Sequence, residues 1–232
     1  MDQLPLGLRL ADRAVFDTFW PQGNEQLLEH LKAVASGAAG GVTWLAGPHA
    51  SGKSHLLQAT CAQAPAARRC GFFPLASLAA LGPAALEGLP RLDLVCVDDV
   101  HLAAGNADWE RALFGLYREL EESGAALLAA APEAPALIRW DLPDLGSRFA
   151  AADIYALRPL DEVAQRDALM LRAKVRGFEL PEEVAQWLQR RYPRDMGTLY
   201  QLLDTLDSAA LKAQRRITVP FIRSVLQRDA QL

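Results

Sequence analysis

The segment that most restricts the fold is GPHASGKS, residues 47–54, which matches the pattern G-x-x-x-x-G-K-[ST]. It follows the apolar run 42–46 and precedes a segment of helical periodicity that begins at Lys53. Glycines in such a loop let successive backbone N–H groups face phosphate oxygens, and the helix N-terminus adds a favourable dipole. The context therefore predicts a nucleotide site, in which Lys53 contacts the β- and γ-phosphates and Ser54 binds Mg²⁺. The candidate nucleotide-binding residues in this loop are Gly47, Pro48, His49, Ala50, Ser51, Gly52, Lys53, Ser54 and His55.

The second motif is a pair of acidic residues at the end of an apolar run. The apolar run 92–97 ends in Asp98 and Asp99. A carboxylate at the carboxyl edge of a parallel sheet can hold a water on Mg²⁺, so Asp98 is the predicted partner of Ser54 in metal and nucleotide binding. Asp99 has two interpretations: it polarises an attacking water, or it caps the helix that follows.

The remaining apolar runs indicate the architecture. Residues 69–73, 125–132 and 154–157 read as further strands, separated by segments of helix length such as 108–124. Continuous apolar strands of this kind are typical of a parallel sheet covered on both faces. From residue 159 the apolar spacing becomes i, i+3, i+4 in the segments 161–178, 181–192 and 194–214. We predict an α/β fold with a five-stranded parallel sheet in residues 14–158, a small all-α domain in residues 159–232, and a tail in residues 1–13.

Two arginines extend the candidate site. Arg148 precedes the last predicted strand of the α/β domain, where an arginine can point toward phosphates bound by a neighbouring molecule and supply charge in trans. Arg194 opens a helix of the C-terminal domain and could reach phosphates bound by its own chain. For each, the alternative is an ion-paired surface residue.

Charge and hydropathy limit the partners. The net charge of −4 argues against broad, sequence-independent wrapping of nucleic acid, which requires a basic surface. A local basic cluster at 190–194 leaves weak DNA contact open. No apolar run approaches the roughly 18 residues of a membrane span, so we expect a soluble, cytoplasmic protein that does not bind membranes.

The motifs GPHASGKSHLLQA, LVCVDDVHLAAG and LGSRF follow one another in an order that resembles AAA+ P-loop NTPases, and within them the DnaA/Hda family of replication proteins. The segment FDTFWPQGNEQLLEHL, residues 16–31, resembles the part of these proteins that packs beside adenine, which implies nucleotide contacts for Phe16 and Phe19. The resemblance covers roughly residues 14–232 and implies a base domain followed by a helical lid. It also implies roles for the candidate residues: Walker A for Lys53 and Ser54, Walker B for Asp98 and Asp99, arginine finger for Arg148 and sensor 2 for Arg194.

The N-terminal segment QLPLGL places large apolar side chains on a tail without strand or helix periodicity. In Hda-type members of the family, an N-terminal hexapeptide that begins Gln-Leu binds a hydrophobic pocket of the sliding clamp, the β subunit of DNA polymerase III. The resemblance therefore implies clamp binding by Gln3, Leu4, Pro5, Leu6 and Leu8, and Gly7 departs from the usual proline. The alternative is packing of the tail onto its own domain. No helix-turn-helix segment follows the lid in the printed sequence, so we expect the protein to reach DNA only indirectly or weakly.

The function that the resemblance implies is negative regulation of replication initiation. With ADP or ATP and Mg²⁺ bound, the protein would dock on the DNA-loaded clamp and use Arg148 to stimulate ATP hydrolysis by DnaA. The strand that normally carries the polar sensor 1 residue reads LLAAAP here, which predicts weak or no ATPase activity of its own, whereas Asp99 retains a potential catalytic group. The alternatives are an ATP-driven motor or helicase loader and a clamp adaptor with a structural nucleotide. Association of copies through the face that carries Arg148 is a further implication.

Overall fold

The computed structural model describes residues 14–192, 195–213, 218, 220–222 and 224–225. These residues form two compact units. The first contains residues 14–19, 25–47 and 53–157, and the second contains residues 20–24, 48–52 and the described residues from 158 onward. The predicted α/β architecture with an additional helical domain is confirmed.

The first unit is built on one parallel sheet with the strand order β2-β3-β4-β1-β5. The register pairs Ala46 at the end of β1 with Ala131 at the end of β4, so the carboxyl ends of these strands meet at one edge. Each predicted apolar run is a strand, with small shifts at the ends. The strands are β1 (Val42–Ala46), β2 (Cys70–Pro74), β3 (Leu94–Asp98), β4 (Ala126–Ala131) and β5 (Asp153–Ala156).

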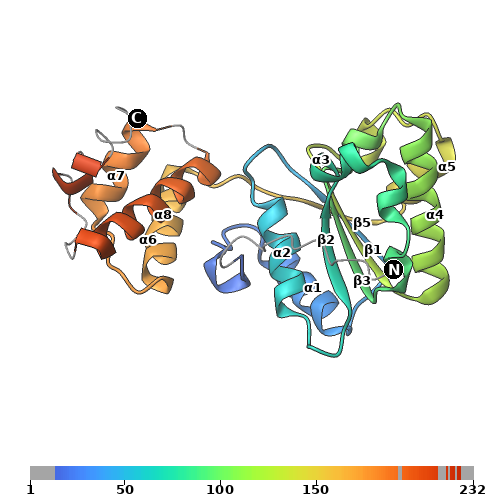
Figure 1. Cartoon of the computed structure of the whole chain (residues 1–232), viewed down its shortest axis with the longest axis horizontal. Helices are drawn as coiled ribbons and strands as arrows, with labels where there is room; N and C mark the ends of the chain where they lie inside the picture. Colours follow the sequence, from blue (N-terminus) through green and yellow to red (C-terminus); the bar gives the residue numbers. More distant parts are fainter. Residues whose placement is uncertain (1–13, 193–194, 214–217, 219, 223, 226–232) are drawn as a thin grey trace. The chain divides into compact units, whose positions relative to one another are not determined.

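Helices cover both faces of this sheet, as Figure 1 shows. One face carries α1 (Glu25–Ser36) and α2 (Lys53–Gln63), and the other carries α3 (Leu75–Leu78), α4 (Ala107–Ser123) and α5 (Pro143–Ala150). The ends of α4 follow from local sequence. The Asn106 side chain accepts the N–H groups of Asp108 and Trp109, and Gly124 ends the helix with a left-handed φ of 71°.

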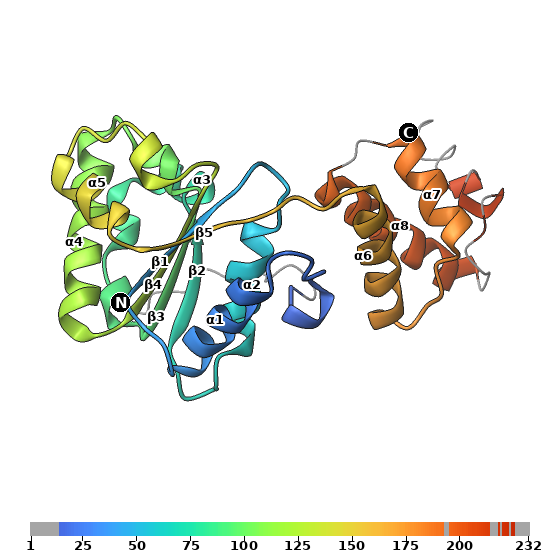
Figure 2. The ribbon, with the colours of Figure 1, turned by 180° about the vertical axis from the view of Figure 1, so that it is seen from behind.

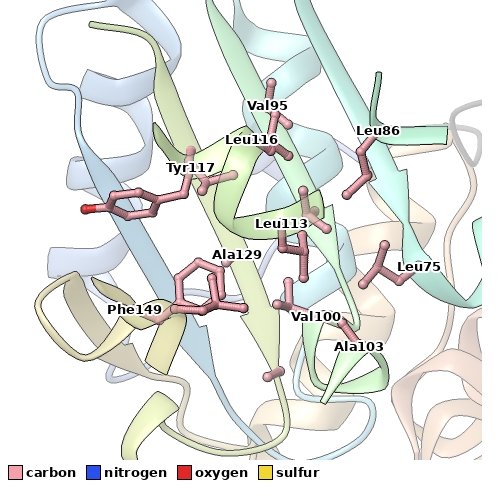
Figure 3. Packing of buried hydrophobic residues seen from close by; sticks show 14 of the residues in the cluster. Leu75, Leu86, Val95, Val100, Ala103, Leu113, Leu116, Tyr117, Ala129 and Phe149 are labelled. Atoms are coloured by element: carbon pink, nitrogen blue, oxygen red, sulfur yellow. The ribbon is translucent and has the colours of Figure 1, made fainter. Parts of the chain in front are cut away.

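Side chains that alternate along the strands supply one core on each face of the sheet. Trp44 and Ala129 point toward α4 and α5, whereas Leu45 and Leu128 point toward α1 and α2. Figure 3 shows Phe149 of α5 lying in the first of these cores, beside Ala129 of β4. Burial on both faces explains why the strands read as continuous apolar runs in the sequence.

The second unit contains the helices α6 (Glu162–Val175), α7 (Glu182–Arg191) and α8 (Met196–Ala213). The three helices lie together in Figure 2. They have a core of their own, in which Leu169, Leu188 and Leu203 are fully buried. The Asp161 side chain caps α6 by accepting the N–H of Ala164. In the part of the chain that the structure describes, no helix combines the length and apolarity needed to cross a membrane.

Candidate nucleotide site

The phosphate-binding candidate is the loop between β1 and α2. Gly47 anchors its start, because the Gly47 N–H donates to the carbonyl oxygens of Ala131 and Pro132 at the end of β4. The loop then passes through left-handed backbone at Ala50, with φ 59°, and at Gly52, with φ 98°. Successive left-handed residues curl the backbone, and α2 begins directly after them at Lys53. The structure thus gives this loop the strand-loop-helix setting that the motif predicts.

Two buried charges lie beside the loop. Lys53 is 8% exposed, and its Nζ donates to the carbonyl oxygen of Gly47 at 2.7 Å. Asp98, at the end of β3, is 3% exposed and accepts a hydrogen bond from the Ser54 hydroxyl. Burial lowers the pKa of Lys53, although the nearby carboxylates of Asp98 and Asp99 act in the opposite direction. Burial likewise raises the pKa of Asp98, against the Ser54 hydrogen bond.

These residues fit a nucleotide with Mg²⁺. The buried Ser51 Oγ has no hydrogen-bond partner among the described residues, and a buried hydroxyl of this kind usually has one. A phosphate oxygen would supply an acceptor for it, and a negative phosphate would also compensate the buried ammonium of Lys53. Ser54 and Asp98, already joined by a hydrogen bond, provide the oxygen ligands that Mg²⁺ prefers.

Asp99 lies beside the acidic end of β3 in an unusual backbone conformation. Its φ is 55° and its ψ is 37°, in the left-handed region, and its N–H donates to Asp98 Oδ1 at 3.0 Å. It occupies the position before the short helix η5 (Val100–Ala103), yet its side chain makes no capping hydrogen bond. The capping interpretation of Asp99 therefore has no support in the structure, and the catalytic interpretation remains a prediction.

The segment that precedes α1 packs against α2 through His55. His55 Nε2 lies 2.9 Å from the carbonyl oxygen of Val15 and 3.4 Å from the Thr18 hydroxyl. The ring of Phe19 lies 5.8 Å from the imidazole, measured between ring centroids. Phe16 is buried in the core between the sheet and α1 and α2. Of the two phenylalanines predicted to contact nucleotide, Phe19 is partly exposed, whereas Phe16 is buried and packs in the core beneath α1 and α2.

Arg148 lies on the last turn of α5, and its side chain is 52% exposed. Its Nη1 is 3.7 Å from Glu121 Oε1, and its guanidinium lies 5.9 Å from the centre of the Tyr117 ring. Because α5 and α2 cover opposite faces of the sheet, the structure does not bring Arg148 together with Lys53. This placement suits an arginine that acts on phosphates outside its own chain.

Several predicted site residues fall outside the described part of the chain. They are Arg194 and the tail residues Gln3, Leu4, Pro5, Leu6 and Leu8. Their predicted roles remain predictions.

Two further residues connect segments around the site, and neither was singled out from the sequence. Asn24 is 4% exposed; its side-chain oxygen accepts the Arg158 N–H at 3.1 Å and its amide donates to the Arg158 carbonyl at 3.4 Å. Glu110 is fully buried on α4. No local pattern pairs Asn24 with a residue so distant in sequence. Glu110 could have been identified from the sequence, because its spacing places it on the apolar stripe of α4 with Leu113 and Tyr117, where a carboxylate is unexpected.

Comparisons with known proteins find one family model and several solved structures that are similar to this chain. Residues 161–226 match the family model described as Hda, lid domain. The fold is similar to domain III of the replication initiation protein DnaA from Thermotoga maritima, with a TM-score of 0.77, 20% identity, and coverage of 94% of this chain and 97% of that one. AMPPCP-bound DnaA from Aquifex aeolicus has a TM-score of 0.61 and 21% identity over 79% of this chain and 61% of that one.

A wider structural likeness extends to the RuvB Holliday junction branch migration motor of Thermotoga maritima. The TM-score is 0.67 at 16% identity, with coverage of 94% of this chain and 73% of that one. A parallel sheet with a P-loop, followed by a helical domain that matches the Hda lid, agrees with the family resemblance of the sequence motifs. Residues 161–226 thus match the Hda lid family model, and the fold of the chain is similar to that of DnaA domain III.

Proposed function

We propose that this protein is a DnaA-related negative regulator of replication initiation, which stimulates hydrolysis of ATP bound to DnaA. The observation that carries the proposal is the placement of Arg148. Its side chain is half exposed on α5, on the opposite face of the sheet from the helix of its own P-loop. An arginine in this position can stabilise negative charge on a phosphate of a neighbouring AAA+ protein.

The proposed role of the P-loop is to hold ADP with Mg²⁺. Lys53 and the backbone of the loop would bind the phosphates, and Ser54 and Asp98 would hold the metal ion. The structurally similar DnaA from Aquifex aeolicus is AMPPCP-bound, which supports adenine nucleotide as the ligand class. The tail residues Gln3 and Leu4 would tether the protein to the sliding clamp and so raise its concentration near DnaA.

The chain's own catalytic apparatus supports a regulatory function over a motor. Ala129, Ala130 and Ala131 fill the end of β4 with buried methyl groups, so this strand presents no side chain that can orient water. The retained Asp99 favours the second candidate, an ATP-driven loader. A basal ATPase assay separates them: ATP turnover by the purified protein alone, lost in Asp99→Asn, would support the loader.

The decisive experiment measures conversion of ATP to ADP on DnaA in the presence of DNA-loaded clamp. Arg148→Ala should lower the stimulated rate by about 10³-fold or more, the range found for arginine fingers supplied in trans. Its affinity for ADP should stay within about twofold, because Arg148 is remote from its own P-loop. Arg118→Ala is the matched control, since the Arg118 side chain on α4 is also more than half exposed and pairs with Glu122.

Normal stimulation by Arg148→Ala would contradict the proposed role of this arginine. A clamp pull-down with Gln3→Ala/Leu4→Ala tests the tail separately. Retention of the variant on the clamp would exclude the tether. Clamp binding that persists while every Arg148 variant stimulates normally would instead indicate an adaptor.

A further inference from the structure

Glu110 is a charged residue in the interior of the first unit, where such residues are rare unless fully paired. It lies on α4 and is 0% exposed. Its carboxylate accepts three backbone hydrogen bonds. Oε1 accepts from the N–H of Gly105 at 2.8 Å and of Asp141 at 3.1 Å, and Oε2 accepts from the N–H of Leu142 at 2.6 Å. Among the residues that the structure describes, no cationic side chain pairs with Glu110, so these backbone donors satisfy the carboxylate.

The three donors come from two different loops. Gly105 ends the segment that runs from Asp98 and Asp99 through η5. Asp141 and Leu142 directly precede α5, the helix that carries Arg148. Glu110 therefore joins the loop after the acidic motif to the beginning of the helix with the predicted finger.

The carboxylate binds the two residues that directly precede α5. Leu142 occupies the N-cap position of α5 and has no polar side chain to bind the first N–H groups of the helix. The Glu110 carboxylate instead accepts the N–H of Leu142 itself, directly before the helix, and its negative charge interacts favourably with the N-terminal end of the helix dipole. Because α5 has only 8 residues, a shift of its first turn moves the last turn, where Arg148 lies.

Packing fixes the rest of α5. Leu145 and Phe149 are buried, and Phe149 packs against Trp44 and Trp140. These contacts hold the apolar face of the helix. Among the described residues, Glu110 is the side chain that hydrogen-bonds the backbone of Asp141 and Leu142, directly before the helix.

We propose that Glu110 is a positioning residue for Arg148, which fixes the start of α5 relative to the loop that follows Asp98 and Asp99. The inference rests on the proposed function of Arg148, because it assigns to Glu110 the geometry that Arg148 needs. A buried carboxylate that served stability alone would have no specific effect on stimulation.

Glu110→Gln tests the inference. The amide group of glutamine is a donor, so one of the backbone N–H groups that Glu110 now binds would face another donor. We expect the saturating rate of stimulated ATP hydrolysis on DnaA to fall about 10- to 100-fold, the effect of small misplacement of a reacting group. The affinity for ADP and the retention on the clamp should change by less than about twofold. Glu122→Gln, an exposed residue of the same helix, should behave like the native protein.

Two measurements keep the result interpretable. Amide hydrogen exchange should become faster at Asp141, Leu142 and along α5 in Glu110→Gln, and remain unchanged in β1 and α2. In the double variant Glu110→Gln/Arg148→Ala, the rate should equal that of Arg148→Ala, because a positioning residue has no effect once its target is removed. Glu110→Asp, which keeps the charge but shortens the side chain, provides a second variant if glutamine prevents folding.

Native rates of stimulation in a folded Glu110→Gln with unchanged exchange would overturn the inference. Further loss in the double variant would also overturn it, because the effect of Glu110 would then be independent of Arg148. If Arg148→Ala itself stimulates normally, the proposed function fails. Faster exchange in α5 of Glu110→Gln would still show that the carboxylate holds this helix.

Discussion

Lys53 and Asp98 are two opposite charges that the first unit removes from water beside the phosphate-binding loop. Burial moves both pKa values toward the neutral forms, downward for Lys53 and upward for Asp98. Such an arrangement is costly in the absence of a ligand and favourable once a phosphate and a metal ion add their charges. The burial of these two charges therefore destabilises the ligand-free protein and, for the same electrostatic reason, favours binding of a phosphate and a metal ion.

The pKa of Lys53, measured by NMR of its ¹⁵Nζ group, should lie below 10.5 in the nucleotide-free protein. Asp98→Asn should lower it further, because the Asp98 carboxylate raises this pKa. Asp108→Asn, an exposed residue of α4, should leave it unchanged. A Lys53 pKa at or above 10.5, or one that Asp98→Asn does not lower, would contradict the electrostatic account of the site.

Lys53 and Asp98 change the free energy of unfolding with pH in different ranges and with opposite sign. Between the lowered folded pKa of Lys53 and 10.5, the folded chain binds fewer protons than the unfolded chain, so the contribution of Lys53 to the free energy of unfolding rises with pH. Between 3.8 and the raised pKa of Asp98, the folded chain binds more protons, so the contribution of Asp98 falls as pH rises.

At the scale of elements, the five strands and the long helix α4 were predictable because local signals bound them, whereas the short helices α3 and α5 were not predicted. The run 42–46 lies between glycines, and β4 ends at Ala131, directly before Pro132. The P-loop and the acidic pair were predictable for the same reason, since each motif is contiguous in sequence. Glu110 and Asn24 were not identified, because their partners are set by tertiary packing of distant segments.

Helix α5 offers an element-scale prediction, because its Gly146 has no room for a side chain. A Cβ at Gly146 would lie 2.8 Å from Trp140 Cδ1, and the Trp140 ring packs against Trp44 and Phe149. Gly146→Ala should therefore lower the free energy of unfolding by about 1–3 kcal/mol, the usual cost of overpacking. The substitution should also reduce stimulation of DnaA, because it displaces the helix that carries Arg148.

Gly115 provides the matched comparison, because it lies in the interior of α4 with open space around its Cβ position. Gly115→Ala should raise the free energy of unfolding by about 0.5–1 kcal/mol, from helix propensity alone. Urea denaturation measures both variants. An equal stabilisation by alanine at the two positions would show that Trp140 does not restrict α5.

At the scale of the whole molecule, the described chain has separate apolar cores in its two units. The sheet unit buries Leu128 and the helical unit buries Leu203, each completely. The part that matches the Hda lid model, residues 161–226, lies wholly in the second unit. A unit with its own core can open without disrupting the other, which permits the two units to have different local stabilities.

Leu203→Ala and Leu128→Ala test this independence. Each removes a fully buried leucine side chain and should destabilise its own unit by about 2–5 kcal/mol. Amide hydrogen exchange should accelerate in α6, α7 and α8 for Leu203→Ala while the five strands retain native protection. An increase of equal size in both units would show that they unfold as one cooperative body. If the units open independently, Leu203→Ala leaves the packing of α4 and α5 intact. Any loss of stimulation in that variant would then come from the second unit and not from α5, the helix that carries Arg148.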